Sequence, residues 1–562
     1  MPTLDTSEVA RLLHEFGQRT ALRGGNPYRA RAYPRAAENL LAVPEPVETL
    51  IAQNRLREIP GVGAAIADIV TKIHKTGGHP ALDAMREEIP SGALDLLTVP
   101  GLRPEKALLL HRELGIASLA ELEKAATEDR IRPVKGLGAA LQKKVLQGIR
   151  IRREGEGRRH IHRAAALLES ATEQLRRSPA GFTRIIPAGD FRRGCELVRD
   201  LAIVAQLPVG NSDPIVRRGG SQLAVHLADE MHYGSVLLLA TGSEDHIAGL
   251  RARAAVLGMT LGEDGLRKSG KLVAGSSEED IYSSLGLSFI PPELREGRGE
   301  IERALEGKLP PLVTDDDIRG ILHAHTDRSD GVDTLEVMAE AVRSRGYDYF
   351  GVTDHSRSAH YAGGLKLEEI NEQHTEIHRL NKHYRDDFRI FKGIESDILA
   401  DGSLDYPEEV LAQFDFVIAS VHGRFALDRE SQTARILRVV ENPYTTILGH
   451  MTGRLLLRRP GYEVDVERIL AACAAQGVAV EINANPWRLD LDWRWHQRAL
   501  ELGCMMSIDP DAHSTDEIDL THWGVEMARK GGVPRSAVLN CLDLPAFAQH
   551  LTKRVQHRRR GP

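Results

Sequence analysis

The sequence contains little cysteine and no long apolar segment. Its four cysteines, Cys195, Cys473, Cys504 and Cys541, lie far apart and form no CxxC pair. This spacing argues against a disulfide framework and a thiolate zinc site, and it suits a reducing cytosol. No charged and apolar leader opens the chain, and no apolar run approaches the roughly 18 residues of a membrane-spanning helix. We therefore expect a cytoplasmic protein without membrane contact.

The remaining composition is that of a globular protein with several domains. At about 150 residues per domain, 562 residues allow roughly three to four domains. The net charge of −7 is unevenly distributed, because residues 1–165 contain 26 Lys and Arg against 20 Asp and Glu, whereas the remainder contains 47 against 60. The basic front favours contact with nucleic acid phosphates, and the acidic remainder suits a site with many carboxylate ligands. Ordinary surface variation is the alternative explanation.

Three similar glycine-containing turns punctuate the basic front. Residues 59–63 (IPGVG), 99–103 (VPGLR) and 134–138 (VKGLG) each precede a helical stretch. Glycine allows a tight turn, and the N–H groups at the start of the next helix would face a phosphate. One such turn is usually only a turn, but three at 35–40-residue spacing predict helix-hairpin-helix binding to the DNA backbone, without base readout. The middle copy has Arg103 in place of the second glycine and would bind most weakly. The predicted DNA contacts are Gly61, Gly63, Gly101, Gly136, Gly138, Lys72 and Lys143.

Strand-like runs that end in metal-type ligands dominate the second half of the chain. After a charged, Pro/Gly-rich connector, apolar runs alternate with amphipathic helical stretches through residue 550. Repeated βα units predict a parallel sheet with covering helices, either a barrel or a doubly wound sheet. Functional groups gather at the carboxyl ends of parallel strands, so the ends of these runs should meet at one face. The candidate ligands are His323, His325, Asp330, His355, Glu395, His422, His450, Asp511 and His513.

The types and spacing of these residues favour a centre with several metal ions. His323 and His325 are two residues apart, so both imidazoles point to the same face of a strand. A single histidine at a strand end is more often only solvated, but nine ligands at or just beyond strand ends are hard to explain in that way. Imidazole and carboxylate without thiolate suit zinc, manganese or iron, and nine ligands suit three ions. Around a phosphate, such ions support hydrolysis of a phosphoester.

Residues 1–312 resemble a bacterial family X DNA polymerase. Residues 241–266 and 279–296 are similar to the thumb of that family, and residues 189–200 match part of its palm motif. In the family, three palm carboxylates hold two metal ions for nucleotidyl transfer. Here Asp200 is the residual palm carboxylate, whereas Ala202 and Gln222 stand at the other two positions. The resemblance therefore implies a palm that is inactive or weak as a polymerase.

The lysine that serves deoxyribose-phosphate lyase activity in the family is also missing. The matching position, six residues past Gly63, is Ile69, and an isoleucine cannot form a Schiff base. Lys72 lies one turn later and is better interpreted as a phosphate contact.

About residues 318–545 resemble the PHP domain (polymerase and histidinol phosphatase) that bacterial family X polymerases carry at their C-terminus. All nine candidate ligands match the pattern of that domain, whose fold is a distorted (β/α)7 barrel. The resemblance favours manganese, with zinc or iron as alternatives. Arg454 and Arg357 are candidates for binding the scissile phosphate. The resemblance assigns His323, His325, Glu395 and Asp511 to a first ion, Glu395, His422 and His450 to a second, and Asp330, His355 and His513 to a third.

Together these observations predict a multidomain fold. An all-α helix-hairpin-helix region precedes an α+β nucleotidyltransferase-like palm and thumb, and an α/β PHP barrel follows. The predicted divisions are a lyase-like helix-hairpin-helix domain (1–80), helix-hairpin-helix fingers (81–165), a degenerate palm (166–255), a thumb (256–300), a linker (301–317) and the PHP domain (318–562).

The predicted activity is 3′-to-5′ exonucleolytic removal of nucleotides by the PHP domain, with abasic-site cleavage as a further activity. The expected partner is gapped, nicked or 3′-ended DNA, bound by a monomer. Three alternatives remain. The first is an active gap-filling polymerase, the second is a small-molecule phosphatase of the histidinol-phosphatase type, and the third is a DNA-binding module with a structural metal site.

Overall fold

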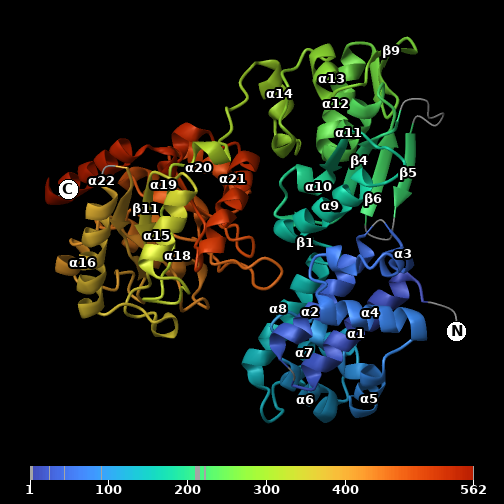
Figure 1. Ribbon diagram of the computed structural model, residues 1–562. Helices are drawn as coiled ribbons and strands as arrows, with labels where there is room; N and C mark the ends of the chain where they lie inside the picture. The colour runs from blue at the N-terminus through green and yellow to red at the C-terminus, as the bar shows by residue number, and fades with distance from the viewer. Residues whose placement is uncertain are drawn as a thin grey trace. The chain divides into compact units, whose positions relative to one another are not determined.

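The chain folds into two compact units. The computed structural model describes residues 4–24, 26–43, 45–89, 91–208, 215–219, 223–385 and 387–560. The first unit comprises residues 1–307 with 457–459, and the second comprises residues 308–456 with 460–562. In Figure 1 the first unit runs from blue to green and the second from yellow to red. Within the described residues, no helix has the length and apolar character needed to cross a membrane.

The first half of unit one is all helical, as predicted. The Asp5 side chain accepts a hydrogen bond from the N–H of Glu8 and caps the first helix, α1, while the Glu8 side chain caps in return. Proline begins three of the helices, where its missing N–H costs nothing. The helices are α1 (Thr6–Leu22), α2 (Pro27–Leu41), α3 (Val47–Ala52), α4 (Ala64–Thr76), α5 (Pro80–Glu88), α6 (Pro104–Leu114), α7 (Leu119–Thr127) and α8 (Gly138–Glu154).

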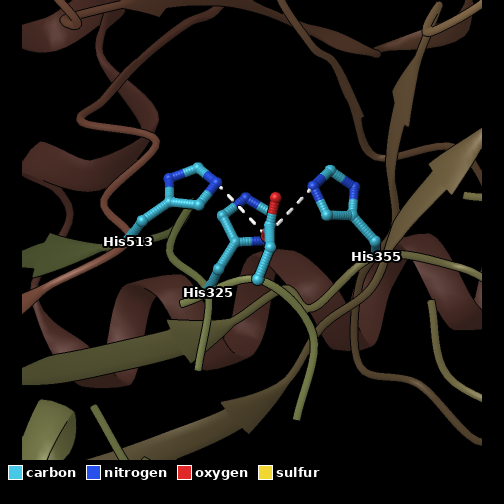
Figure 2. A group of neighbouring side chains, drawn as sticks. His325, His355 and His513 are labelled. Carbon is cyan, nitrogen blue, oxygen red and sulfur yellow. Dashed lines mark ion pairs between the residues drawn. The ribbon is translucent and has the colours of Figure 1, made fainter. Parts of the chain in front are cut away.

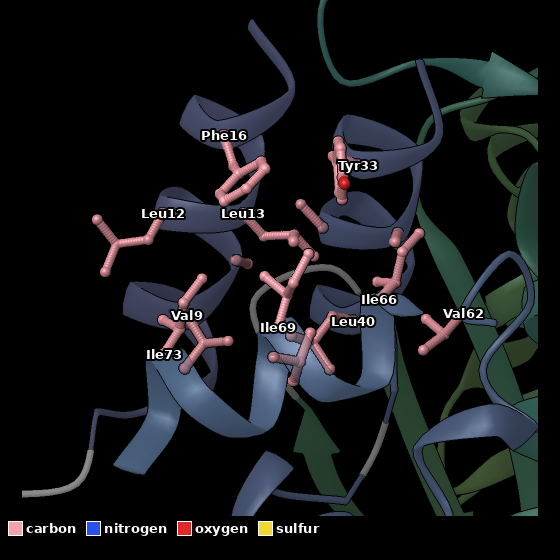
Figure 3. Close-up of a cluster of buried hydrophobic side chains, with 14 of the residues drawn as sticks. Val9, Leu12, Leu13, Phe16, Tyr33, Leu40, Val62, Ile66, Ile69 and Ile73 are labelled. Atoms are coloured by element: carbon pink, nitrogen blue, oxygen red, sulfur yellow. The ribbon is translucent and has the colours of Figure 1, made fainter. Parts of the chain in front are cut away.

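Two separate apolar cores hold these helices together. In the first, Leu13 of α1, Leu40 of α2 and Ile69 of α4 point into one buried cluster (Figure 3). The second core contains Leu110 of α6 and Val145 of α8. The position that a lyase lysine would occupy is thus a buried core position, since Ile69 is 7% exposed.

The second half of unit one contains a mixed sheet and a small antiparallel sheet. In the mixed sheet the strand order is β2-β4-β6-β5, with β4 parallel to β6 and the other pairs antiparallel. The antiparallel sheet β7-β8-β9 belongs to the thumb region. The strands are β1 (Arg159–His160), β2 (Ile185–Ala188), β3 (Leu197–Val198), β4 (Leu201–Gln206), β5 (Ile215–Gly219), β6 (Leu223–Ala228), β7 (Met259–Gly262), β8 (Gly265–Lys268) and β9 (Lys271–Ala274).

Helices pack on this mixed sheet and form most of the thumb. Both α9 and α11 contact β4. The segment predicted as a linker from residue 301 to 317 begins within α14 and includes a short 3₁₀ turn, η5 (Asp315–Asp317). The helices are α9 (Ile161–Arg176), α10 (Gly189–Arg192), α11 (Tyr233–Thr241), α12 (Glu244–Val256), α13 (Glu278–Ser284) and α14 (Glu300–Leu305).

Unit two consists of parallel strands with helices around them (Figure 1). Two parallel groups, β10-β11-β12 and β13-β14-β15-β16-β17, are joined by isolated parallel bridges between Ala324 and Ala512 and between His355 and Glu395. The prediction of repeated βα units is confirmed, whereas closure into a (β/α)7 barrel stays a prediction. The strands are β10 (Gly320–Ile321), β11 (Tyr349–Val352), β12 (Arg389–Lys392), β13 (Glu395–Asp397), β14 (Ile418–Ser420), β15 (Ile447–Leu448), β16 (Ala479–Asn483) and β17 (Met506–Asp509).

The helices of unit two follow from amphipathic sequence and good caps. In α15, Leu335, Met338, Ala339 and Val342 recur at helical spacing and are all buried, and the Thr334 side chain accepts from the N–H of Val337. The helices are α15 (Leu335–Ser344), α16 (Leu367–Tyr384), α17 (Glu408–Leu411), α18 (Arg429–Val440), α19 (Val466–Gln476), α20 (His496–Leu502), α21 (Thr521–Lys530) and α22 (Leu544–Arg560).

Candidate metal centre

The structure brings the nine candidate ligands together, and all but Glu395, which is the first residue of β13, follow the carboxyl end of a unit-two strand. His323 and His325 follow β10 directly, and both side chains are fully buried. The His325 ring lies between two other imidazoles, with ring centroids 4.4 Å from His355 and 4.3 Å from His513 (Figure 2). These residues come from three different strand ends, which explains how residues far apart in sequence meet.

One group of ligands surrounds Asp330. Its Oδ1 atom lies 3.3 Å from His513 Nε2, 3.4 Å from His355 Nε2 and 3.9 Å from His325 Nδ1. Asp330 and His513 are each about one-third exposed, whereas His325 is buried. This group therefore forms the solvent-facing side of the cluster.

Two further groups lie deeper. In the first, Asp511 Oδ1 is 3.1 Å from His325 Nε2 and 3.5 Å from His323 Nε2. In the other, Glu395 lies among imidazoles: its Oε2 atom is 2.9 Å from His355 Nδ1, and its Oε1 atom is 3.2 Å from His422 Nε2, 3.0 Å from His450 Nε2 and 3.4 Å from His323 Nε2. The possible metal-binding groups are His325 with Asp330, His355 and His513; His323 with His325 and Asp511; and His355 with Glu395 and His422.

The three groups resemble the three expected ion positions, but His325 and His355 were not expected to belong to two groups each. Glu395 was expected to bridge two ions, and it contacts a ligand expected at each, His323 and His422; in addition, the imidazoles of His325 and His355 each belong to two groups. His450 was expected beside Glu395 and His422, and its Nε2 atom does contact Glu395. The same side chains thus converge, with a different pattern of sharing.

The residues fit metal ions because several buried ligand atoms face other ligands of the cluster without a hydrogen bond. Among the described residues, His323 Nε2, His325 Nδ1, His355 Nδ1 and Glu395 Oε2 are buried and make no hydrogen bond. A buried polar atom without a partner costs on the order of 1–3 kcal/mol, so several in one place need an explanation. Lone pairs on imidazole nitrogen and carboxylate oxygen are what zinc, manganese and iron bind. A divalent cation would satisfy all four atoms.

The cluster also shifts the protonation of its own members. Burial alone would raise the pKa of Glu395, but the His422 and His323 imidazoles hold it well below its usual value. Burial would lower the pKa of His355, but Glu395 and Asp330 raise it to about 10. The Glu395 carboxylate therefore stays ionised and available as a ligand, while a metal ion has to displace the proton of the His355 imidazole.

Two carboxylates that the sequence interpretation missed orient the ligands. Glu481 Oε1 accepts a hydrogen bond from His323 Nδ1 at 2.5 Å, and its Oε2 atom accepts one from the backbone N–H of His450 at 2.5 Å. Asp397 Oδ1 accepts from His422 Nδ1 at 2.6 Å. Such partners fix the ring orientation and the tautomer of a metal-ligating histidine. A glutamate in the otherwise apolar run 478–482 was the available signal for Glu481.

The arginine beside the cluster is Arg488 instead of the expected Arg454. The Arg454 guanidinium donates to Asp492 at 2.6 Å and to the carbonyls of Arg488 and Leu489. Its N–H groups are therefore engaged within the protein and are not directed at a phosphate. Arg488 Nε instead lies 3.6 Å from Asp511 Oδ2. Arg357 is half exposed and donates to the carbonyl of Asp405.

In unit one, the three predicted hairpins adopt the same turn. The N–H groups of Val62, Leu102 and Leu137 donate to the carbonyls three residues earlier, at 3.0–3.1 Å. The first glycine of each turn, Gly61, Gly101 or Gly136, has a φ of 79–87°, a conformation that other residues rarely adopt. Gly138 also has a positive φ, of 73°, whereas Gly63 has a φ of −81°.

The helices that follow these turns present free N-terminal N–H groups. No side chain caps α4, α6 or α8 at its N-cap residue, Gly63, Arg103 or Leu137. Uncapped helix starts are suited to phosphate. Lys72 and Lys143 are exposed on α4 and α8, whereas Lys106 donates to the carbonyl of Gly136 at 2.8 Å.

The palm presents one carboxylate at the position where its family pattern requires three. Asp200 is exposed just before β4. Ala202 pairs in register with Ala188 on one side and with Ala224 on the other. Gln222 lies outside the described residues. Within those residues, the groups able to hold a metal ion include no palm side chain.

The Asp229 carboxylate lies too far from Asp200 to complete a metal site with it. Asp229 follows the far end of β6, whose residue Ala228 pairs with Gln206, whereas Asp200 precedes the opposite end of β4. Six residues of strand separate the two ends by about 20 Å. Asp229 is in addition bound to His232 Nδ1 at 2.7 Å.

Comparison with known proteins agrees with this geometry. Residues 322–485 match the PHP domain family, residues 5–79 a helix-hairpin-helix domain, residues 93–150 a SAM-like helix-hairpin-helix tandem and residues 236–296 the DNA polymerase beta thumb. Unit two thus contains a metal-dependent phosphoesterase domain of the PHP type, and unit one contains DNA-binding modules.

The relatives extend this assignment to the whole chain. The chain is 32% identical to the DNA polymerase/3′-5′ exonuclease PolX of Bacillus subtilis (strain 168), over 96% of this chain and 97% of that protein. It is 27% identical to the probable phosphatase Teth514_1060 of Thermoanaerobacter sp. (strain X514), over 41% of this chain and 94% of that protein. A probable phosphatase of Caldanaerobacter subterraneus, TTE1963, is similar over 42% of this chain and 92% of its own length, at 27% identity. The chain belongs to the family X DNA polymerases that carry a C-terminal PHP domain.

Proposed function

We propose that this protein is a DNA-processing exonuclease, in which the PHP domain removes nucleotides from 3′ ends. The observation that carries the proposal is the cluster of nine ligands, in which His323 Nε2, His325 Nδ1, His355 Nδ1 and Glu395 Oε2 are buried and make no hydrogen bond. That cluster lies in the same chain as three hairpins with uncapped helix starts, which suit a polymeric phosphate substrate. A 3′-5′ exonuclease activity is part of the printed name of the Bacillus subtilis relative.

Three divalent ions are the proposed occupancy, with manganese preferred over zinc or iron. Each of the nine predicted ligands would contribute to at least one ion, and His325 and His355 are positioned to serve two. Bound divalent ions at a phosphoesterase centre lower the pKa of water and neutralise charge on the phosphoryl group. Glu481 and Asp397 hold the His323 and His422 rings in place for this task.

The remaining roles are assigned to basic groups. Arg488, which lies beside Asp511, is the proposed contact for the scissile phosphate. The hairpins at Gly61, Gly101 and Gly136 hold the DNA backbone on gapped, nicked or 3′-ended substrates. We propose further that the protein acts as a monomer in the cytoplasm.

The polymerase core serves in this proposal as a scaffold. Asp200 alone cannot hold two metal ions. In β4, the strand that follows it, Ala202 pairs in register with Ala188 on one side and Ala224 on the other, and none of these side chains can bind a metal. The division of unit one into lyase-like, fingers, palm and thumb regions is likewise part of the proposal.

The direct test is to incubate the full-length protein with a gapped, 5′-labelled duplex and manganese, zinc or iron, with and without dNTPs. We expect the primer to shorten with manganese in either case, and Glu395→Ala to abolish shortening. Asp200→Ala is the matched control and should shorten the primer at the wild-type rate. Primer extension that depends on Asp200 would overturn the scaffold role, and no shortening with any ion would overturn the exonuclease.

A small-molecule phosphatase is the second candidate, because the relatives that match only unit two are named probable phosphatases. A screen of small phosphomonoesters beside 3′-ended DNA separates the two activities. We expect kcat/KM to be far higher for DNA, since the hairpins contribute only to binding of a polymer.

A further inference from the structure

An exposed tyrosine lies beside the metal centre. Tyr361 belongs to the short 3₁₀ turn η6 (His360–Ala362) and is 71% exposed. Its ring centroid lies 6.3 Å from that of His355 and 6.4 Å from that of His422. These imidazoles belong to the Glu395 group, and His355 also belongs to the Asp330 group. The ring is therefore adjacent to the ligands and also open to solvent.

The loop that carries Tyr361 is firmly attached to the domain. Its neighbours Ala359, Ala362 and Leu365 are buried. The N–H of Leu365 donates to the carbonyl of His355 at 2.8 Å, and the N–H of Ser358 donates to Asp405 at 2.6 Å. Small apolar residues thus hold the loop, while its one large aromatic side chain points outward and contributes little to folding.

A second loop supports this arrangement from the Asp330 side. A Cβ atom added to Gly363 would lie 3.2 Å from the carbonyl oxygen of Ser329, so the Tyr361 loop packs against the Asp330 loop. On the latter, Val332 is 74% exposed, and its N–H donates to the carbonyl of His513 at 2.8 Å. The exposed side chains of Tyr361 and Val332 thus lie on two adjoining loops beside the Asp330 group.

We propose that Tyr361 is a specificity-determining residue that stacks on the 3′-terminal nucleobase of the DNA substrate. The inference rests on the proposed exonuclease function, because it requires the last phosphodiester to lie at the metal centre. The base of the departing nucleotide is then one sugar away from the ligands, and the Tyr361 ring is the aromatic surface at their edge. Aromatic stacking accepts any base, since every base has a π-face. The subsite therefore takes nucleobases in general.

The test compares two 5′-labelled duplexes with recessed 3′ ends, one ending in thymidine and the other in an abasic tetrahydrofuran residue. Stacking on one base contributes enough to change binding about 10-fold or more. We expect the wild-type protein with manganese to remove thymidine with a kcat/KM about 10-fold or more above that for the abasic residue. Tyr361→Ala should erase this ratio and leave the abasic rate unchanged, whereas Tyr361→Phe should keep it.

Val337→Ala is the matched control, because Val337 is also an exposed apolar residue of unit two, 48% exposed on α15. It should behave as wild type on both substrates. A wild-type protein that removes both ends equally, or a Tyr361→Ala variant that keeps the ratio, contradicts stacking while exonuclease activity stands. Equal losses on both substrates would instead make Tyr361 a structural residue and overturn the inference. If the wild-type protein removes neither end with any ion, the proposed function itself fails.

Discussion

The palm of unit one and the PHP centre of unit two both present charged side chains near strand ends, but these side chains differ in what they contact. In the palm, Arg193 donates to Glu296, Asp190 and the carbonyl of Thr241 at 2.6–2.9 Å. Arg192 forms an equally close pair with Glu278, at 2.6 Å. These two arginines are thus paired within unit one. In the PHP centre, by contrast, four buried ligand atoms make no hydrogen bond and face other ligands of the cluster.

This difference distinguishes arginines that are used inside the fold from ligands that converge on one centre. A network whose charges are all paired gains rigidity but has nothing left to bind a ligand. A set of unpaired lone pairs costs stability in the free protein and is retained where a ligand satisfies it. Family membership alone would assign metal chemistry to both regions, whereas among the described residues the groups that could hold a metal ion lie in unit two.

The largest difference between the two regions is expected when a ligand that belongs to two metal-binding groups is removed. His325→Ala takes one imidazole from both the Asp330 group and the Asp511 group. Loss of several kcal/mol of charge stabilisation corresponds to a fall in kcat/KM of about 1,000-fold or more. Exonuclease kinetics together with the manganese content of the purified protein measure the effect, and both should fall. Asp200→Ala should change neither, and a palm variant that loses bound manganese would place metal chemistry in unit one after all.

A smaller effect is expected from a residue that only orients a ligand. Glu481→Gln keeps the shape of the side chain but weakens the acceptor for His323 Nδ1 and the His450 N–H. Losing such a partner lowers metal affinity about 10- to 100-fold. Calorimetric titration with manganese measures this without any substrate. The control is Glu340→Gln, since Glu340 pairs with Arg343 on the surface of α15, and unchanged affinity in Glu481→Gln would contradict the positioning role.

The sequence predicted the features that depend on local pattern and missed those that depend on distant contacts. The hairpins follow from glycines that need a positive φ, as at Gly61, and this requirement is visible in a five-residue window. The ligands could be predicted because functional side chains gather at the carboxyl ends of parallel strands, and His323 and Asp511 each follow such a strand. By contrast, Glu481 reaches His323 across 158 residues, and nothing local distinguishes Arg488 from Arg454. Only the folded loop shows that the Arg454 guanidinium is hydrogen-bonded within the protein.

The Glu15 ion pairs should stabilise unit one at neutral pH, and this contribution should be lost in acid over a defined pH range. Hydrogen bonds from Arg86 and Arg19 lower the pKa of Glu15 from its usual 4.5 to about 2, against the effect of burial. A carboxylate with a lowered folded-state pKa stabilises the fold above its unfolded pKa, and this contribution disappears as pH falls from about 4.5 to about 2. After allowance for solvent screening we expect Glu15→Gln to cost about 1–2 kcal/mol at pH 7 and almost nothing near pH 2.

Thermal unfolding at several pH values, followed by two signals, checks this expectation. All four tryptophans, Trp487, Trp493, Trp495 and Trp523, lie in unit two, so their fluorescence follows that unit alone, whereas circular dichroism follows both. Glu15→Gln should lower the transition seen by circular dichroism and leave the tryptophan transition in place. An equal shift of both signals, or a difference that persists at pH 2, would contradict the assignment to the Glu15 ion pairs.

The smallest expected effect tests whether the hairpins of unit one hold DNA as a backbone-binding surface. Lys143 is exposed on α8, the helix that follows the third hairpin. Removing one phosphate contact should lower the slope of log K against log salt concentration by about 0.9 and weaken binding equally for all sequences. Fluorescence anisotropy of a labelled gapped duplex between 50 and 200 mM salt, roughly the range over which such slopes are resolved, measures both effects. Lys382→Ala, which removes a lysine in the last turn of α16 in unit two, should leave the slope unchanged. A sequence-dependent loss in Lys143→Ala would mean that the hairpin region reads bases, which would contradict the proposed contact with the DNA backbone.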